Sequence, residues 1–504
     1  MSLDAIVIGA GHNGLIAAAR LGQAGRKVLV LEAQDRPGGL LGEAGGMRMA
    51  AMPTGLNPEV ARTLALHRYG LSYGKPMATI ALGAGAPVRI DGNRVEGMDP
   101  ATAAAYAELH GRLAKQAGAL GRMLLKTPPR LRDGGLADLV SLGRMGLSVR
   151  MLGKADMRDL LRIVLSNVWD VLNDEIGDGP LAGALAMDAT LGGAMGPRSP
   201  GTVLALLYRM AGAGAGAPGQ RAMPLGGPGA LIDALAKCVE AAGGAVRTGA
   251  VVERILVGDD RVEGVRLAGG EELRAPLVLS NAHPRRTLVD LLGVAGIDAE
   301  DARRARSMAT EGMVARLDFT LSALPDVAGL SAADLGQRLV IAPDMQVIET
   351  AFNAAKYGEL PERPALECIF VQGETPRLSV SAEFVPCTLK AGWTKASRDL
   401  LAASVLAVLE GAMPGIGARV TGTEIATPAD IEARFGLPGG HWHHGEFRVD
   451  QMLMLRPFAG AAQYRMPVAG LYLCGAGAHP GGDISGAAGW NAAGQALKDG
   501  RAGK

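Results

Sequence analysis

The stretch from residue 4 to residue 32 constrains the fold more than any other part of the chain. An apolar segment at residues 4–8 (DAIVI) runs into the glycine turn GAGHNG at residues 9–14, and residues of helical composition follow up to Gly25. A second apolar segment at residues 27–31 (KVLVL) ends on Glu32. This order of strand, G-x-G-x-x-G turn, helix, strand and acid predicts a dinucleotide-binding βαβ unit.

Each position of the motif has a physical task. Gly9 permits the tight turn, Gly11 lets the backbone approach a pyrophosphate, and Gly14 lets the helix and the strand pack closely. The start of the helix offers unpaired N–H groups and the positive end of its dipole to phosphate. Glu32 can accept hydrogen bonds from a ribose diol. The alternative, a glycine-rich turn without a ligand, leaves Glu32 without a purpose.

Size and composition exclude several classes of protein. The 504 residues are enough for two or three domains with sizeable cores. A net charge of +1 and an aromatic content of 4% give no case for nucleic-acid binding. None of the four cysteines forms a C-x-x-C pair, and no clean run of about 20 apolar residues predicts a membrane span. Because the first strand begins at residue 4, no cleaved signal peptide is expected and the cytoplasm is the default location.

Two further segments carry a family resemblance. The acid is followed by DRPGG at residues 35–39, and near the C-terminus residues 464–493 read YRMPVAGLYLCGAGAHPGGDISGAAGWNAA. With the helix and strands at residues 224–284, the chain resembles bacterial phytoene desaturase-like flavoproteins of the flavin amine oxidase superfamily. The resemblance includes the carotenoid desaturase, β-carotene ketolase and pyridine nucleotide-disulphide oxidoreductase domain-containing protein 2 branches.

The resemblance implies a tightly but non-covalently bound FAD. The Gly38-Gly39 pair would lie against the diphosphate, and the strand at Val252 would meet the adenine. Leu40 stands where many relatives have an arginine, which leaves that phosphate contact to the backbone and Arg36. The residues expected to contact FAD are Gly9, Gly11, His12, Asn13, Gly14, Glu32, Ala33, Arg36, Gly38, Gly39, Val252, Gly475, Ala476, Gly482, Asp483 and Ile484.

The C-terminal glycine-rich segment has its own physical logic. A strand, a glycine loop and a helix start form a second group of N–H donors. The positive helix end near Asp483 would face the flavin pyrimidine ring and stabilise negative charge there. Ala476 occupies a position where many flavoproteins carry an acid, and Asp483 is the nearest acid in this chain.

The predicted fold class is α/β, with a Rossmann-like FAD-binding domain and an inserted α+β substrate domain made of a sheet and a helical lid. The FAD-binding domain is expected to comprise residues 1–70, 216–300 and 436–504, and the substrate domain residues 71–215 and 301–435. Strands predicted at 313–321, 366–371 and 378–385 would form an antiparallel sheet as the floor of the substrate cavity. The run GAGAGAPG at 212–219 is expected to be a flexible connector.

Residues 111–158 are basic and apolar together. They contain ten Lys or Arg and three Asp, a local excess of +7, interleaved with Met, Leu and Val. One interpretation is a peripheral membrane contact through which an apolar substrate enters. The other is a solvated face of a helical lid with an apolar inner side.

The histidine-rich segment at 441–444 (HWHH) has three interpretations. His444 is the candidate general base. A metal site is the second, although no carboxylate is spaced to complete one, so no metal is expected. A polar turn before the flavin-binding strand is the third.

Three hypotheses on function follow. The first is an FAD-dependent desaturase, dehydrogenase or isomerase acting by hydride transfer on a large apolar substrate such as a carotenoid, another polyene or a fatty-acyl chain. The second is a flavin amine or amino-acid oxidase, which the low aromatic content disfavours because such a site needs an aromatic cage. The third is a flavin-retaining protein whose role is binding or assembly without turnover. The sequence does not predict the oligomeric state.

Overall fold

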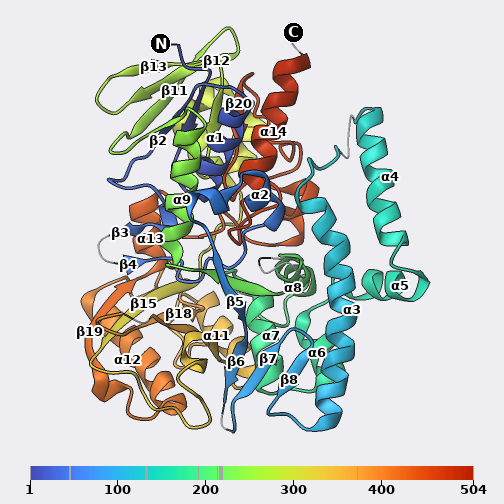
Figure 1. Cartoon of the computed structure of the whole chain (residues 1–504), viewed down its shortest axis with the longest axis vertical. Helices are drawn as coiled ribbons and strands as arrows, with labels where there is room; N and C mark the ends of the chain where they lie inside the picture. The colour runs from blue at the N-terminus through green and yellow to red at the C-terminus, as the bar shows by residue number, and fades with distance from the viewer. Residues whose placement is uncertain are drawn as a thin grey trace.

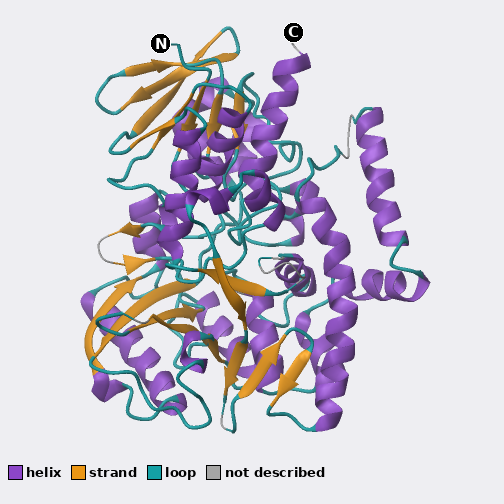
Figure 2. Ribbon diagram, in the orientation of Figure 1, coloured by secondary structure: helices purple, strands orange, loops and turns teal. Residues whose placement is uncertain are grey.

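The computed structural model describes residues 2–44, 47–83, 85–130, 134–190, 192–212, 214, 219–371 and 373–502. Most of the connector predicted at 212–219 lies outside these residues. The strands gather in two separate groups, each surrounded by helices (Figure 2).

A parallel sheet of five strands lies at one end of the molecule, near both chain termini (Figure 1). Its strands come from three separate parts of the chain, and Ile6 in the central strand pairs with Leu29 on one side and Val278 on the other. The strands are short apolar runs, as expected where a parallel sheet is covered by helices. In order they are β10 (Ala245–Arg247), β2 (Val28–Leu31), β1 (Ala5–Ile8), β14 (Val278–Ser280) and β20 (Leu471–Leu473).

Three helices pack together beside this sheet. Helix α1 contacts both α9 and α14, and its apolar residues from Leu15 to Leu21 are buried. A small antiparallel sheet follows α9 in the chain, as the tight turns predicted. These elements are α1 (His12–Gln23), α9 (Pro228–Ala241), α14 (Ala487–Ala502), β11 (Val252–Gly258), β12 (Arg261–Leu267) and β13 (Glu272–Arg274).

The second large sheet has eight strands. The strands predicted at 313–321, 366–371 and 378–385 are present in it as β15, β17 and β18, and they pair antiparallel as predicted. The sheet as a whole is mixed, because β6 pairs in parallel with β16. The sequence prediction missed β16, which begins with an arginine, and β19, whose residues are mostly polar. In order the strands are β19 (Val420–Ala426), β15 (Val314–Leu321), β18 (Arg377–Glu383), β17 (Leu366–Val371), β16 (Arg338–Ile341), β6 (Thr79–Leu82), β7 (Val88–Asp91) and β8 (Arg94–Glu96).

The two faces of this mixed sheet differ in chemistry. Leu317, Val380 and Leu339 belong to a buried cluster that includes Leu401 and Val405 of α12 (Lys395–Ala412). Because side chains alternate along a strand, the residues between them, such as Arg316, face the opposite side. That opposite face looks toward the interior of the molecule and positions part of the site.

Helices cover the rest of the second half. The helix predicted over 99–125 is present, and Asp99 caps it by accepting from the backbone N–H groups of Ala101 and Thr102 at 3.0 Å. The helices here are α3 (Pro100–Leu124), α5 (Lys154–Ile163), α6 (Val168–Ile176), α7 (Pro180–Thr190), α8 (Thr202–Ala211), α11 (Met345–Lys356) and α13 (Pro428–Phe435). The short elements elsewhere are α2 (Pro58–Thr63), α10 (Ala299–Arg306), β3 (Glu43–Ala44), β4 (Met47–Arg48), β5 (Tyr73–Met77) and β9 (Arg221–Pro224).

Helix α4 (Leu136–Arg150) stands at the edge of the molecule, outside α3 (Figure 1). None of its residues is buried. Arg132 and Asp133, which belong to the basic segment predicted at 111–158, lie outside the described residues. Within the described part of the chain, no helix is both long enough and apolar enough to cross a membrane.

Candidate functional site

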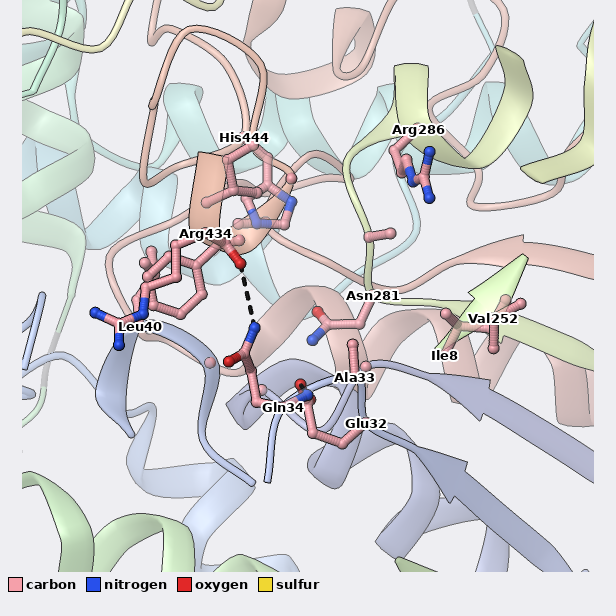
Figure 3. Close-up of a pocket in the computed structure, with 18 of the residues that line it drawn as sticks. Ile8, Glu32, Ala33, Gln34, Leu40, Val252, Asn281, Arg286, Arg434 and His444 are labelled. Atoms are coloured by element: carbon pink, nitrogen blue, oxygen red, sulfur yellow. Dashed lines mark hydrogen bonds between the residues drawn. The ribbon is translucent and has the colours of Figure 1, made fainter. Parts of the chain in front are cut away.

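A cavity of 660 Å³ lies at the carboxyl ends of the parallel strands (Figure 3). Residues that end or follow four neighbouring strands line it, among them Ile8, Glu32, Asn281 and Ala476. Ligands bind at this edge of an open α/β sheet, and cofactor pockets have volumes of about 300–1,000 Å³. The predicted residues that line this dinucleotide cavity are Gly9, Gly11, His12, Asn13, Glu32, Ala33, Gly38, Gly39, Val252, His444 and Ala476.

The glycine turn has no room for side chains. A Cβ on Gly14 would lie 2.1 Å from the carbonyl oxygen of Gly9, and a Cβ on Gly11 would lie 2.8 Å from Nδ2 of Asn281. Gly38 has a φ of +132° and donates its N–H to the carbonyl of Ala10 at 2.9 Å. The cavity wall is therefore bare backbone here, which lets a phosphate approach the start of α1.

Glu32 is fixed in the cavity wall by the backbone. Its Oε2 accepts from the N–H of Ala10 at 2.7 Å, and its Oε1 accepts from the N–H of Gln34 at 3.0 Å. The side chain is 7% exposed. Each carboxylate oxygen keeps a further lone pair, so the group can still accept from a diol in the cavity.

Arg456 joins the two loops that close the cavity, which we call the histidine loop (residues 441–446) and the glycine loop (residues 475–486). Its guanidinium donates to the carbonyl oxygens of His443 at 2.5 Å, Glu446 at 3.1 Å and Ala476 at 2.9 Å. The side chain is fully buried, and burial lowers the pKa of Arg456 to about 10. Tyr208 adds a hydrogen bond from its hydroxyl to the carbonyl of Gly482 at 3.2 Å.

The histidines around this cavity are neutral at pH 7. Burial lowers the pKa of His12 to about 4 and the pKa of both His441 and His444 to about 3. Nε2 of His12, Nε1 of Trp442 and Nδ1 of His444 are buried and have no hydrogen-bond partner in the described structure. All three residues line the dinucleotide cavity, although Nε1 of Trp442 lies next to Gly192, which is not part of the wall. A ligand that reaches His12 and His444 can supply hydrogen-bond partners for their ring nitrogens.

A second cavity of 100 Å³ adjoins the first. The two share His12, Leu40, Trp442 and Ala476 in their walls. The predicted residues Gly482, Asp483 and Ile484 line this second cavity. Its wall contains both apolar and charged side chains. The apolar ones include Leu40, Leu41, Met49, Met52, Met77 and Ile484, and the charged ones are Arg209, Arg221, Arg316, Arg338, Glu367 and Asp483.

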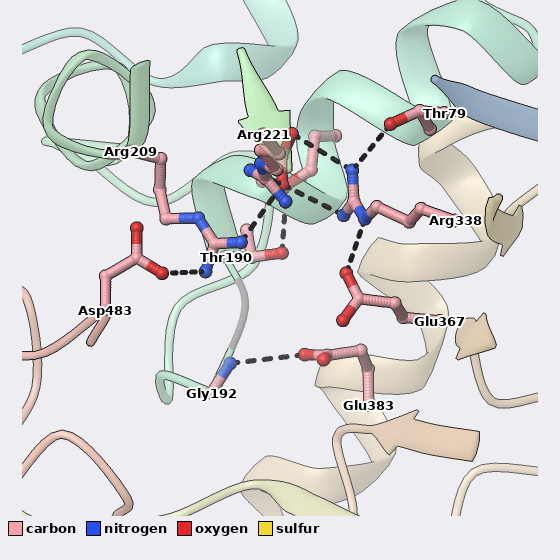
Figure 4. A network of polar contacts seen from close by, with 11 residues as sticks. Thr79, Thr190, Gly192, Arg209, Arg221, Arg338, Glu367, Glu383 and Asp483 are labelled. Atoms are coloured by element: carbon pink, nitrogen blue, oxygen red, sulfur yellow. Dashed lines mark hydrogen bonds and ion pairs between the residues drawn. The ribbon is translucent and has the colours of Figure 1, made fainter. Parts of the chain in front are cut away.

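Asp188 of α7 forms ion pairs with three of these arginines, Arg209, Arg221 and Arg338. Figure 4 shows these arginines together with Glu367 and Asp483. The Asp188 carboxylate accepts from Arg221 at 2.9 Å, from Arg338 at 2.9 Å and from Arg209 at 3.4 Å. Burial alone would raise the pKa of Asp188, but the three guanidinium groups hold it well below its usual value.

Three predicted cofactor residues lie outside both cavity walls. Gly14 and Gly475 pack against backbone instead, and a Cβ on Gly475 would lie 2.5 Å from the carbonyl oxygen of Asn281. Arg36 is exposed and does not line the dinucleotide cavity. Its contact with a diphosphate stays a prediction, and the basic residues that do line the cavity are Arg285, Arg286 and Arg434.

His444 faces the dinucleotide cavity, whereas its neighbour His443 lines the second cavity. Its role as a general base stays a prediction. A pKa of about 3 makes its neutral ring a weak base. Among the described residues, no three His, Cys, Asp or Glu side chains converge as a metal site would require.

Sequence reasoning missed Asn281, Trp442 and all four arginines of the second cavity. Asn281 follows β14 directly, and its position at a strand end was a usable signal. Arg316 carried a signal too, because it alternates with Ala315 and Leu317 on a strand expected to form a cavity floor. No local signal brings it to Arg209, which lies on a helix more than one hundred residues earlier.

The dinucleotide cavity fits FAD on three observations. It offers a side-chain-free turn at a helix start for the diphosphate, a fixed carboxylate at Glu32 for a ribose diol, and buried unpaired ring nitrogens at His12 and His444. The glycine loop would hold the flavin end, since Ala476 lies in the walls of both cavities. Its helix α14 begins at Ala487, close behind Asp483.

Comparison with known proteins agrees with this geometry. Residues 7–44 match the model of an NAD(P)-binding Rossmann-like domain. The chain is 31% identical to pyridine nucleotide-disulfide oxidoreductase domain-containing protein 2 of Rattus norvegicus, over 98% of this chain and 93% of that protein. It is 25% identical to the lycopene-forming phytoene desaturase of Pseudescherichia vulneris, over 95% of this chain and 96% of that protein.

Among solved structures, cyclohexylamine oxidase from Brevibacterium oxydans IH-35A superposes with a TM-score of 0.58. The two are 16% identical, and the superposition covers 99% of this chain and 100% of the oxidase. At this identity the likeness shows the fold alone. The fold is thus the Rossmann-like FAD-binding fold of the flavin amine oxidases, as the sequence predicted.

Proposed function

This chain belongs to the family of pyridine nucleotide-disulfide oxidoreductase domain-containing protein 2, and on that premise we propose that it is an FAD-dependent oxidoreductase. We propose further that it acts as a desaturase, dehydrogenase or isomerase on a large apolar substrate, such as a carotenoid, another polyene or a fatty-acyl chain. FAD is the proposed cofactor, and it would supply the acceptor for a hydride when bound.

The observation that carries the proposal is the common wall of the two cavities. A ligand in the dinucleotide cavity and a ligand in the second cavity would meet at His12, Leu40, Trp442 and Ala476. Leu40 and Met52, two of the apolar residues in the wall of the second cavity, offer contacts for a hydrocarbon chain. A further cavity of 70 Å³, lined by Tyr106, Leu206 and Met210 among others, shares Met77, Arg221 and Arg338 with the second and would continue the path.

The residues of the chain would act by binding, orienting and excluding water. Arg456 and Tyr208 hold the histidine and glycine loops in one arrangement, which fixes where cofactor and substrate meet. Burial of the histidine loop keeps water away from the reacting carbon. A site whose histidines are weak bases suits a reaction in which loss of hydride, rather than removal of a proton by a strong base, carries most of the barrier.

The visible spectrum of the purified protein, followed by heat release and identification of the chromophore, tests the proposal. We expect released FAD, and anaerobic bleaching by a polyene or an acyl substrate. Colourless protein that cannot be reconstituted with FAD would contradict the cofactor assignment. A flavin that no substrate class bleaches would favour the alternative of a binding or assembly role, and peroxide release with simple amines would favour an amine oxidase.

We also propose that helix α4 and the start of α5 contact a membrane surface peripherally. Leu136, Leu139, Leu147 and Met151 are each more than half exposed, with fractions of 79%, 62%, 58% and 72%. Exposed basic residues, including Arg144, Arg150, Lys154 and Arg158, accompany them. Apolar side chains beside basic ones are typical of a segment that lies on an anionic bilayer.

Co-sedimentation with phosphatidylserine-containing vesicles tests this contact. We expect the wild type to sediment with these vesicles and the Leu139→Asp, Leu147→Asp double variant to stay in the supernatant. A double substitution at Val257 and Tyr357, which are also exposed but lie elsewhere, is the control. Equal binding of all three proteins would contradict the assignment.

A further inference from the structure

The charged face of the mixed sheet forms part of the wall of the second cavity. Arg316 on β15 pairs in register with Ser381 on β18, and Ser381 pairs in register with Glu367 on β17. Arg338 on the next strand, β16, pairs in register with Thr79 of β6. Glu367 is opposite Val340 in the register, and its carboxylate accepts from Arg338 two residues away. Polar side chains on one face therefore extend over five neighbouring strands, and a cavity made for hydrocarbon alone would not need them.

Two of the four arginines in this wall are fully paired (Figure 4). Arg338 donates from Nε to Glu367 at 2.6 Å and from Nη2 to Asp188 at 2.9 Å. Arg221 donates to Asp188 at 2.9 Å. Arg338 and Arg221 thus neutralise the charges of Asp188 and Glu367, because two tightly held cations face two carboxylates.

Arg316 is held by neutral groups instead. It donates to the hydroxyls of Ser379 and Ser381, and the nearest oxygen of Asp318 lies 3.9 Å from its Nη2. Its side chain is 2% exposed, and its Nε has no hydrogen-bond partner in the described structure. This buried guanidinium therefore has one N–H donor without an acceptor and no carboxylate within hydrogen-bond distance.

Arg209 is paired with two carboxylates, but less tightly than Arg338. It lies 3.4 Å from Asp188 and 3.6 Å from Asp483, distances longer than those of the paired arginines. Its side chain is 9% exposed, and its Nε also has no partner among the described residues. Burial raises the pKa of the nearby Glu383 well above the usual value, and Glu383 makes no ion pair with Arg209 in the described structure.

We propose that the second cavity binds the carboxylate of an otherwise apolar substrate, with Arg316 and Arg209 as its positioning residues. This inference rests on the proposed function and narrows its substrate class from hydrocarbon polyenes to fatty-acid-like carboxylates. A volume of 100 Å³ holds an end group and a few carbons, since one water occupies about 30 Å³ in the liquid. Leu41 and Met49, which are apolar residues of the same wall, contact the methylene groups of the substrate next to its carboxylate.

The same wall argues against a cationic substrate. A protonated amine in this cavity would face four guanidinium groups and only two carboxylates, Glu367 and Asp483, each of which is already paired with an arginine. Like charges at such distances in a buried site destabilise binding by several kcal/mol. Similarity of fold to an amine oxidase therefore does not extend to the charge of the pocket.

Isothermal titration of the FAD-loaded wild type with octanoate, octanol and octylamine tests the inference without any substitution. We expect octanoate to bind at least about tenfold more tightly than octanol, because a charge-assisted pair is worth about 1.5–3 kcal/mol and 1.4 kcal/mol is tenfold. Octylamine should bind most weakly. Octanol binding as tightly as octanoate would overturn the inference.

Variants then locate the anion site. Arg316→Gln and Arg209→Gln should each abolish the preference for octanoate over octanol while FAD content stays within the range of the control. Arg209→Gln should also lower the melting temperature, because Arg209 pairs with Asp188 and Asp483. The control is Arg398→Gln, which breaks a two-fold ion pair with Asp430 at 2.6 and 2.7 Å on the far helix α12. Arg316→Lys, which keeps the charge and loses Nε, should retain part of the preference if Arg316→Gln does not fold.

The outcomes separate the two proposals. Purified protein that cannot be loaded with FAD contradicts the proposed function, whatever octanoate does. Protein that holds FAD and shows no octanoate preference overturns only the carboxylate site. Loss of FAD in Arg316→Gln or Arg209→Gln, with the fold intact, would assign these arginines to the cofactor and overturn their role toward substrate.

Discussion

The two cavities are neighbours that are built in opposite ways. In the dinucleotide cavity the backbone forms much of the wall, because Gly11 and Gly38 have no side chains. Glu32, the carboxylate of this wall, is itself held by backbone N–H groups. In the second cavity long charged side chains from distant strands and helices converge on Asp188 and Glu367. Most of the predicted wall of the first site comes from residues 9–39, and residues near 252, 281, 444 and 476 complete it. The four arginines of the second site come from residues 209, 221, 316 and 338.

This contrast explains which of the two sites can change its contacts through single substitutions. Backbone contacts suit a cofactor that stays the same, since changing any one glycine destroys the turn. Side-chain contacts can be replaced one at a time, so the pocket that meets substrate can change its charge while the fold is kept. The likeness to an amine oxidase in fold, combined with an arginine-rich pocket, is an instance of this separation.

The largest effect is expected from Gly14→Ala. The new Cβ would lie 2.1 Å from the carbonyl oxygen of Gly9, so the turn or α1 must move. We expect a loss of at least about 4 kcal/mol in the free energy of unfolding and no retained flavin. Flavin absorbance per protein and thermal melting measure both. Gly118→Ala in α3, where nothing lies within 4 Å of the new methyl, is the control and should not destabilise.

Asp188→Asn tests the charge network of the second cavity. The substitution keeps the shape and removes the anion shared by Arg209, Arg221 and Arg338, which leaves buried guanidinium groups without compensation. We expect a destabilisation of about 3 kcal/mol, measured by thermal or urea unfolding of the FAD-loaded protein. Asp399→Asn, which breaks an exposed pair with Lys395, should cost less than about 0.5 kcal/mol. Equal effects of the two substitutions would contradict the network.

Low pH should reduce the free energy of unfolding through the buried histidines of the dinucleotide cavity. Burial lowers the folded-state pKa of His12 to about 4 and of His444 to about 3, below the unfolded value of 6.5. Their contribution to stability is therefore complete above pH 6.5 and is lost as the pH falls toward 4. At pH 5 each histidine should cost on the order of 1–2 kcal/mol. The readout is the melting temperature of the FAD-loaded protein at pH 7 and pH 5.

His444→Gln should lose less stability than the wild type between these two pH values, and the exposed His67→Gln should behave like the wild type. Identical slopes for all three proteins would contradict the burial argument. The same variant tests the predicted base role. A general base contributes about 10²–10⁴-fold in rate, and with a pKa of about 3 we expect His444→Gln to slow turnover less than about tenfold.

The smallest effect is expected from Tyr208→Phe, at a residue that contacts the glycine loop at Gly482. It removes one hydrogen bond of 3.2 Å to the glycine loop and keeps the ring, whose centroid lies 4.6 Å from that of Phe447. We expect a loss of about 1 kcal/mol and a small shift of the flavin absorption maximum. Tyr357→Phe, at a position 74% exposed, should change neither. An unchanged spectrum with unchanged stability would show that Tyr208 does not position the loop.

The sequence by itself determined the fold class and the dinucleotide cavity. Both follow from local patterns, because a glycine turn between a strand and a helix places its own backbone, and Glu32 at the next strand end faces the same cavity. Even the helix predicted over 99–125 follows from a local cap at Asp99. Eleven of the predicted site residues line this one cavity, and three more line its neighbour.

Only the tertiary structure decided the pocket beside the cofactor. Arg316 and Arg209 lie on a strand and a helix that are far apart in the chain, and neither has a neighbour in sequence that reveals the other. The mixed sheet also depends on a parallel pairing between β6 and β16, which brings residues 79–82 beside 338–341. Long-range pairing sets which side chains share a face, and that sharing, rather than any motif, gives this cavity its charge.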